Sequence, residues 1–263
     1  MNSLTPGQKD SLYFQRVKSL IETHGKAEEK QLLSRWQRPL QDFLFLASPA
    51  LLSGRQKLEI GVQSTLALKL NLKTPTGLPG GASLLPHFTR GSSLEPWADL
   101  ALRFGLRCHM GIKCTPEAFS RELYIYLATP EHSAAAAALN ADAAKLLAMR
   151  SGLFIGMDDA RGASIYYTAD NSSYLEQVAN ELGIEAGKMN ATAIQQIRMS
   201  HGIMAPGKSG IDFNPLTPEV LARLLSRYPL PWFRYLFRGA KLSSGFFGGD
   251  HATREFSLYA NVT

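Results

Sequence analysis

The sequence predicts an α+β fold: a ten-stranded antiparallel barrel with a polar lumen, built from repeated helix–hairpin units and surrounded by helices. Apolar and polar residues alternate with a period of two in successive stretches, which is typical of strands. These strands form five hairpins, each separated from the next by a helical segment. A barrel is favoured over an open sheet, because an open sheet of such strands would leave two long edges unpaired.

The hairpin over residues 56–73 shows two chemically different faces. Its aliphatic face carries Leu58, Ile60, Val62, Leu66, Leu68, Leu70 and Leu72, and its polar face carries Glu59, Lys69, Asn71 and Lys73. In a barrel, helices cover the aliphatic face and the polar face lines the lumen. Small barrels usually fill their interior with apolar side chains. This polar lumen therefore predicts a wet cavity with a bound anionic ligand, whereas an open sheet would place the same face in solvent.

The first half of the chain is predicted to be mainly helical outside this hairpin. Apolar residues at helical spacing cover 8–24 and 27–47, and the second helix is interrupted or kinked near Pro39. Residues 74–93 contain three Pro and four Gly and are predicted to form an irregular loop. A short helix follows over 95–102.

Hairpins and helices alternate through the rest of the chain. The hairpins are predicted over 103–113 with 120–128, 153–159 with 163–169, 194–204 with 209–215, and 241–249 with 254–262. The helices are an alanine-rich one over 130–150, one capped by Asn171 or Ser172 that ends at 182, and one from Thr217 to about 228. Residues 231–237 are predicted to pack as a short helix or turn.

Composition limits the cellular locations and the binding partners that can be expected for this protein. The 263 residues suit a single domain over 1–263, and 45% hydrophobic residues are enough to build a sizeable core. The net charge of +6 favours an anionic partner, but the basic residues are scattered, so nucleic acid is not expected. The polar N-terminus, the absence of a long apolar run and two isolated cysteines predict a cytoplasmic protein with no membrane contact.

Glu59 is the first candidate for catalysis. A carboxylate that faces the lumen can accept a proton from a nucleophile; the competing interpretation is a salt bridge to Lys69 or Lys73 across the hairpin. A basic set can bind a diphosphate by charge-assisted hydrogen bonds, without a metal; the competing interpretation is that these side chains lie on solvated strand faces. Four tyrosines on the same face can shield a cation, although tyrosine is also simply a good strand former. The basic residues are Lys69, Lys73, Arg107, His109 and Arg198, and the tyrosines are Tyr124, Tyr126, Tyr166 and Tyr259.

Residues 202–209, GIMAPGKS, match the phosphate-binding pattern GxxxxGK[ST] in full. Such a loop must lead into a helix that points its N-terminus at the phosphates. The residues that follow, GIDFNPLTP, are poor helix formers, and Pro206 removes an amide donor. The stretch is therefore predicted to be a hairpin turn, with nucleotide hydrolysis as a minor alternative.

The arrangement resembles the ABBA or PT-barrel prenyltransferases, and most of all the cyanobactin-type peptide prenyltransferases. Leu58-Glu59 matches the apolar residue and glutamate of that family's first strand, Lys69 its basic residue on the second strand, and Tyr259 its inward tyrosine on the last. The resemblance covers residues from about 50 to 262 and rests on pattern and topology. It implies transfer of a dimethylallyl group from an allyl diphosphate, with Glu59 as base, no required metal or cofactor, and Mg²⁺ at most as a stimulant.

The acceptor is the part of this activity that the sequence leaves open. Glu122, Asp158 and Asp212 add negative charge where the family has basic or neutral residues, and paired carboxylates can hold a guanidinium. The sequence also ends at Thr263, directly after the last predicted strand, which predicts an open barrel mouth that admits a peptide, cyclic or not. Tyr, Trp and Arg side chains are therefore the expected acceptors. The alternatives are a small aromatic metabolite as acceptor, or a barrel that binds an anionic ligand without chemistry.

Overall fold

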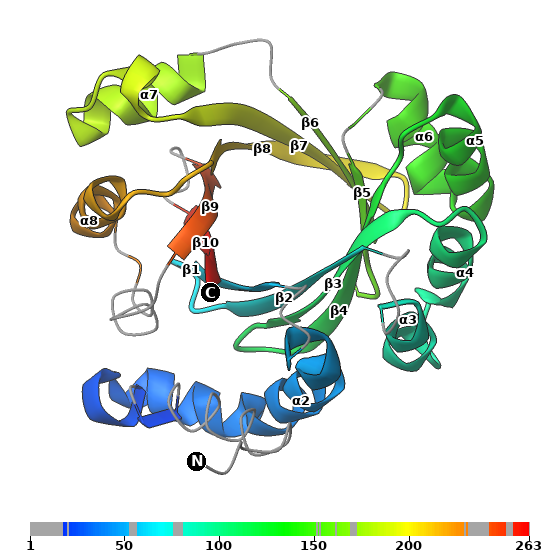
Figure 1. Ribbon diagram of the computed structural model, residues 1–263, viewed down its shortest axis with the longest axis horizontal. Coiled ribbons are helices and arrows are strands. Elements are labelled where there is room, and N and C mark those ends of the chain that lie inside the picture. The colour runs from blue at the N-terminus through cyan, green and yellow to red at the C-terminus, as the bar shows by residue number, and fades with distance from the viewer. Residues whose placement is uncertain are drawn as a thin grey trace.

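The computed structural model describes residues 18–19, 21–52, 57–75, 81–150, 152, 154–160, 162–168, 173–228, 230, 242–250 and 255–262. Ten strands form one closed antiparallel barrel in the order β1-β10-β9-β8-β7-β6-β5-β4-β3-β2 (Figure 1). The predicted barrel is confirmed, and the open sheet is excluded because β1 pairs with β10. None of the helices in these ranges has the length and apolarity needed to cross a membrane.

The elements follow the predicted alternation of helices and hairpins. The strands are β1 Lys57–Gln63, β2 Leu68–Pro75, β3 Arg107–Cys114, β4 Phe119–Tyr126, β5 Phe154–Asp158, β6 Gly162–Thr168, β7 Ala191–Ser200, β8 Ile203–Phe213, β9 Leu242–Asp250 and β10 Glu255–Val262. The helices are α2 Ala27–Leu52, α3 Gly81–Thr89, α4 Glu95–Arg103, α5 Pro130–Leu139, α6 Ala141–Met149, α7 Ser173–Leu182, α8 Pro218–Arg227 and the short 3₁₀ helix η1 Ala186–Lys188.

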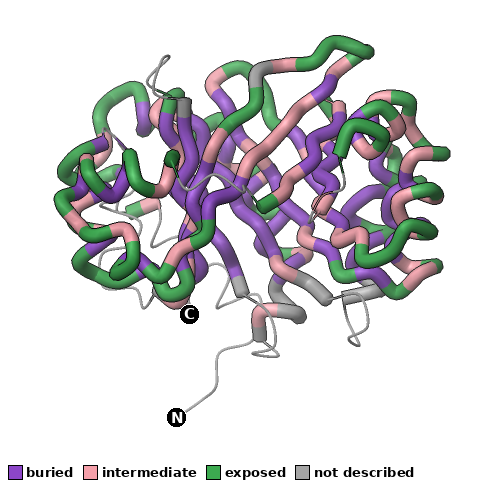
Figure 2. Tube along the Cα trace, turned by 90° about the horizontal axis from the view of Figure 1, so that it is seen from above, coloured by how far each residue is buried: buried purple, intermediate pink, exposed green. Residues whose placement is uncertain are grey.

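The hydrophobic core is the layer between the barrel wall and the helices around it. Along β1 and β2, Leu58, Ile60 and Leu72 are buried against this layer, as the two-residue period predicts. Trp36 of α2 joins it and donates its indole N–H to the Thr115 carbonyl at 2.9 Å. Figure 2 shows buried residues along the barrel strands and exposed residues on the outer sides of the helices. Because the apolar faces of the strands point outward to the helices, their polar faces point into the lumen.

Packing overrides two local helix breakers, so the predicted interruption at Pro39 and the predicted loop over 81–89 are both wrong. α2 continues through Pro39 to Leu52, since its buried stripe includes Trp36 before the proline and Leu40 after it. Residues 81–89, predicted as loop, form α3 although Pro86 lies inside it. Leu85 is fully buried and accepts a hydrogen bond at its carbonyl from the Thr89 hydroxyl at 2.9 Å.

The alanine-rich segment forms two helices, α5 and α6, where one was predicted. Asn140 between them has extended backbone angles, φ −153° and ψ 131°. Its side chain accepts a hydrogen bond from the Ala143 amide at 3.0 Å and so caps α6. The second hairpin is also shorter than predicted: β3 begins at Arg107, because α4 continues to Arg103.

The turn of the fourth hairpin lies at His201-Gly202, where both residues have positive φ values of 51° and 78°. This is the two-residue geometry that suits a tight hairpin. The predicted turn further along is wrong: residues 203–213 form β8, with a bulge where the register shifts opposite Gln196 and Arg198. No helix follows the GKS sequence within this described segment, so the phosphate-binding pattern lacks the structure it needs.

Several predictions lie wholly or mainly outside the described residues. They are most of the first helix over 8–24, the cap at Asn171 or Ser172, and the segment over 231–237.

Candidate active site

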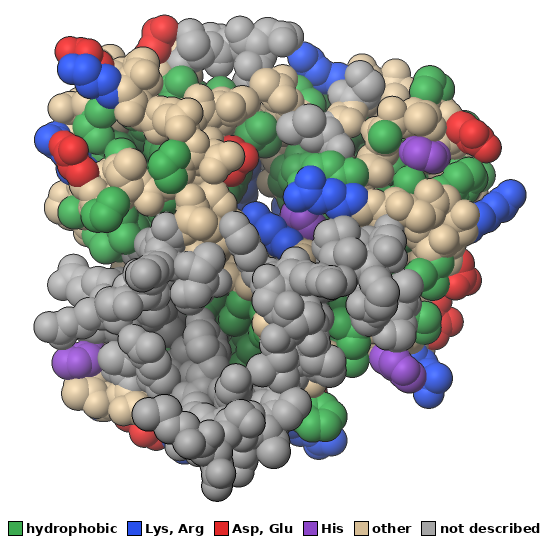
Figure 3. Space-filling view, in the orientation of Figure 1, with side chains coloured by type: hydrophobic (Ala, Val, Ile, Leu, Met, Phe, Trp, Pro, Cys, Tyr) green, Lys and Arg blue, Asp and Glu red, His purple; other side chains and the backbone are tan. Residues whose placement is uncertain are grey.

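A cavity of about 410 Å³ occupies the barrel lumen. In the view of Figure 3, basic side chains and a histidine border a hollow near the middle of this face. Of the residues predicted for the site, those that line the cavity are Glu59, Lys69, Lys73, His109, Glu122, Tyr124, Tyr126, Asp158, Tyr166, Arg198, Asp212 and Tyr259. The exception is Arg107, which is exposed and whose guanidinium carbon lies 4.7 Å from the ring centroid of Tyr126, a residue of the lining.

Strand register explains why residues far apart in sequence meet here. Glu59 lies opposite Asn71 of β2 and Asn261 of β10, so β1 closes the barrel beside it. Lys73 lies opposite His109, which lies opposite Tyr124. Because each strand alternates its faces, these cross-strand neighbours all point inward.

Glu59 is buried and both of its carboxylate oxygens have partners. Lys73 Nζ lies 2.8 Å from Oε2, and Asn71 Nδ2 donates to Oε1 at 2.7 Å. Burial raises the pKa of Glu59, but the Lys73 ammonium and the two hydrogen bonds outweigh it and hold the pKa below its usual value. The predicted salt bridge is thus present, with Lys73 as the partner, and it keeps the carboxylate ionised and able to accept a proton.

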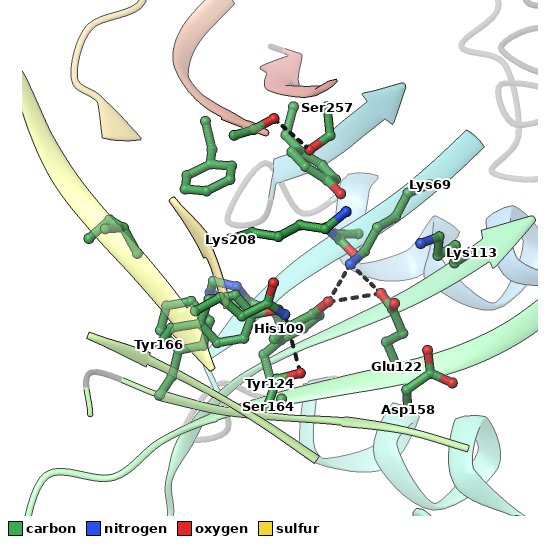
Figure 4. Close-up of a pocket in the computed structure, with 18 of the residues that line it drawn as sticks. Lys69, His109, Lys113, Glu122, Tyr124, Asp158, Ser164, Tyr166, Lys208 and Ser257 are labelled. Atoms are coloured by element: carbon green, nitrogen blue, oxygen red, sulfur yellow. Dashed lines mark hydrogen bonds and ion pairs between the residues drawn. The ribbon is translucent and has the colours of Figure 1, made fainter. Parts of the chain in front are cut away.

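A second buried ion pair joins Lys69 to Glu122. Both side chains are less than a tenth exposed, and the Tyr124 hydroxyl, which donates to Glu122 Oε2 at 2.9 Å, also contacts the ammonium (Figure 4). Burial lowers the pKa of Lys69, but Glu122 outweighs it and raises the pKa above its usual value. The ammonium also lies 4.6 Å from the Tyr124 ring centroid and 5.5 Å from that of Tyr259. Lys69 is therefore a cation held among aromatic faces.

The other two predicted basic residues that line the cavity, His109 and Arg198, differ from these paired lysines. Burial and the neighbouring Lys73 lower the pKa of His109 to about 3, with Glu59 offsetting part of the shift. His109 is therefore neutral near pH 7 and offers a hydrogen bond instead of a charge. Among the described residues, no carboxylate is ion-paired with Arg198, so its guanidinium remains available to an anion in the cavity.

The acids predicted for the acceptor have different environments. Glu122 is engaged by Lys69. Asp158, at the end of β5, accepts hydrogen bonds from the Ser120 hydroxyl at 3.3 Å and the Ala160 amide at 2.8 Å. Asp212 is exposed at the cavity rim, where partial burial and Glu59 raise its pKa and Lys73 partly offsets them. Asp212 is thus the predicted acid with the greatest access to a ligand.

Sequence reasoning did not single out two phenylalanines of the cavity, Phe154 and Phe246. The Phe154 ring stacks on Tyr166 at 4.4 Å between centroids. Phe154 and Asp158 are four residues apart on β5, so the two-residue period places both side chains on the same face. The lumen position of Phe154 could therefore have been predicted from the sequence. Phe246 and Phe247 are adjacent, and only the register with Asp212 shows which of them faces the lumen. Lys113, Gln196 and Lys208 also line the cavity.

No protein-family profile and no curated protein matches this sequence. Solved structures do match. AnaPT from Neosartorya fischeri aligns with a TM-score of 0.54 and 11% identity, over 96% of this chain and 91% of its own. NotF, solved in complex with brevianamide F and DMSPP, aligns with a TM-score of 0.57 and 12% identity, over 100% of this chain and 96% of its own. Both are ABBA-type prenyltransferases.

The fold is the PT barrel. At this level of identity the likeness establishes architecture, and the chemistry has to be argued from the lumen of this chain. That lumen combines an ionised carboxylate, a buried cation among aromatic rings and an accessible guanidinium. In a PT barrel such a set can hold an anionic leaving group, shield a carbocation and accept a proton.

Proposed function

We propose that this chain transfers a dimethylallyl group from an allyl diphosphate to a side chain of a peptide, as the cyanobactin-type enzymes do. The observation that carries the proposal is Glu59: an ionised, oriented carboxylate inside a closed barrel lined with aromatic rings. The neighbouring structures support prenyl transfer, and the ligands of NotF support a diphosphate donor with a second, separate substrate.

In the proposed reaction the bond between the allylic carbon and the diphosphate oxygen breaks, and the diphosphate leaves with the electron pair. A nucleophilic atom of the acceptor forms a new bond to the allyl carbon, and the proton that it loses passes to Glu59. Tyr124, Tyr126, Tyr166 and Tyr259 line the space in which positive charge develops, and aromatic faces stabilise cations. Water that reached the cation would capture it, so the bound substrates must fill this space during the reaction.

The diphosphate is assigned to Arg198, Lys69, Lys73 and His109, with Arg107 at the rim. Arg198 is the strongest of these candidates, because the two lysines already neutralise Glu59 and Glu122. Binding of this kind needs no metal, and Mg²⁺ enters the proposal at most as a stimulant.

The acceptor is proposed to be a Tyr, Trp or Arg side chain of a linear or cyclic peptide. Three acids of the lining, Asp212, Asp158 and Glu122, support an acceptor that carries N–H groups. The brevianamide F bound to NotF supports the alternative, a small free acceptor.

The test is an incubation of the protein with dimethylallyl diphosphate and a panel of cyclic peptides that differ only in one residue, Tyr, Trp, Arg, His or Ser. Free tryptophan and brevianamide F serve as small acceptors. We expect a mass gain of one dimethylallyl group on a peptide, faster than on either small compound. A faster gain on a small compound supports the alternative acceptor. Binding of dimethylallyl diphosphate with no transfer to any compound would leave a ligand-binding barrel.

A further inference from the structure

The aromatic side chains of the lumen fall into two groups on opposite sides of the barrel. One group belongs to β4, β5 and β6, and the other to β9 and β10; β7 and β8 separate them on one side, and β1 to β3 on the other. Figure 4 shows the separation: Tyr124 and Tyr166 project from one side, Ser257 of β10 lies on the other, and the Lys69 ammonium lies between.

The first group, here called the β4–β6 wall, consists of four rings in mutual contact. The centroids are 4.4 Å apart for Phe154 and Tyr166, 5.3 Å for Tyr126 and Phe154, and 5.8 Å for Tyr124 and Tyr166. Gly156 makes this packing possible, because a Cβ there would lie 2.8 Å from the Tyr124 ring. The rings form a continuous aromatic surface that suits an apolar or cationic group.

The second group, the β9–β10 wall, consists of Phe246 and Tyr259, with ring centroids 5.9 Å apart. Each ring lies close to a glycine of a neighbouring strand. A Cβ would come within 2.1 Å of Tyr259 at Gly61 and within 2.0 Å of Phe246 at Gly210. Any other residue at these two positions would push the rings into the cavity, so the glycines keep an open aromatic platform.

The base lies on the side of this platform. Glu59 of β1 lies opposite Asn261 of β10, and β10 also carries Tyr259. Asp212 of β8 lies opposite Phe246 of β9. A general base must be within hydrogen-bond reach of the atom that loses the proton. The nucleophilic side chain of the acceptor therefore belongs near β1 and β10, which leaves the β4–β6 wall to the allyl group.

We propose that the two walls divide the substrates. The β4–β6 wall binds the allyl group of the donor. Phe246 binds the planar side chain of the acceptor together with Tyr259, whose ring also borders the space in which the cation develops. Phe154 and Phe246 are then specificity-determining residues for different substrates. The inference rests on the proposed prenyl transfer and assigns each substrate to a side of the lumen.

The test compares Phe154→Leu and Phe246→Leu, with Phe45→Leu as the matched control because Phe45 is 76% exposed on α2, outside the lumen. The dissociation constant of dimethylallyl diphosphate is measured by calorimetry. The KM and kcat are measured for the best acceptor of the panel described above. Loss of one aromatic contact is expected to change the affected constant by about fivefold. Phe154→Leu raises the donor dissociation constant and leaves the acceptor KM unchanged, and Phe246→Leu does the reverse.

Two outcomes overturn the division: both variants change the same constant, or the assignments are exchanged. A thermal melt of each variant measures general destabilisation of the fold, which the division does not predict. If destabilisation explained the changes in both variants, that result would count against the division. Failure of the wild-type protein to modify any acceptor is a separate result. It would remove the proposed function itself, whereas transfer by the wild type with the wrong response to the two substitutions removes only the division.

Discussion

The Lys73 ammonium lies 2.8 Å from the Glu59 carboxylate, and the pair spans the first hairpin diagonally inside the lumen. Asn71, opposite Glu59 on β2, donates to the other carboxylate oxygen at 2.7 Å. The carboxylate is thus fixed in orientation as well as in charge. A base prepared in this way does not have to lose a proton or rotate before it acts.

Glu59→Gln is expected to slow transfer by about 10²-fold or more, because it removes the general base and keeps the shape of the side chain. The affinity for dimethylallyl diphosphate is expected to remain nearly the same. Single-turnover rates and calorimetry measure the two quantities. A variant that turns over at the wild-type rate would reduce Glu59 to a salt-bridge partner of Lys73.

Lys73→Met is expected to move the acid limb of the pH profile of kcat/KM to higher pH. The base works in its ionised form, so wild-type activity falls only as the pH drops through the lowered pKa of Glu59. Without Lys73, burial dominates and raises that pKa. By the same linkage, wild-type Glu59 contributes stability above its unfolded-state pKa, and this is lost as the pH falls through the folded pKa.

The control for this profile is Lys30→Met, an exposed lysine of α2, which should leave the acid limb in place. An acid limb that does not move in Lys73→Met would show that another group controls the ionisation seen in the profile.

Lys69→Met is expected to destabilise the fold by about 3–5 kcal/mol, because it leaves Glu122 buried without a counter-ion. The double variant Lys69→Met/Glu122→Leu should recover most of this loss. Urea unfolding measures the free energy of unfolding of both variants. The control is loss of the exposed pair Lys188–Glu185, which is expected to cost less than about 1 kcal/mol of stability. Equal costs for the buried and the exposed pair would contradict the buried network.

Arg198→Ala is expected to weaken binding of dimethylallyl diphosphate by about 1.5–3 kcal/mol, the range for a hydrogen bond to a charged group. Calorimetry provides the measurement, and Arg38→Ala, on the exposed face of α2, provides the control. Unchanged affinity in the Arg198 variant would move the diphosphate to the other cations of the lumen.

Transfer is expected to continue in the presence of a chelator, since the proposed diphosphate site consists of side-chain cations. The rate of prenyl transfer with and without the chelator, followed by addition of Mg²⁺, tests this directly. Complete loss that Mg²⁺ restores would point to a diphosphate held by the metal.

The strands and their inward faces could be predicted from the sequence because the signal is local. A period of two fixes which residues share a face, so Glu59, Lys69 and Lys73 could be assigned to one side of a hairpin without knowledge of the fold. The same rule correctly grouped Glu122, Tyr124 and Tyr126 on one face of β4, and all of them line the cavity. Closure of the barrel followed from the number of similar strands and the cost of unpaired edges.

Partners across the lumen were decided only by the tertiary structure. Lys69 and Tyr124 are 55 positions apart, and the order β2-β3-β4 brings the lysine to Tyr124 and Glu122. Which of several acids pairs with which lysine depends on the stagger between strands. No local pattern encodes that stagger, because it is set by closure of the whole sheet. α3 formed through Pro86 for a similar reason, since burial of Leu85 in the hydrophobic core outweighs a backbone donor that the proline cannot supply.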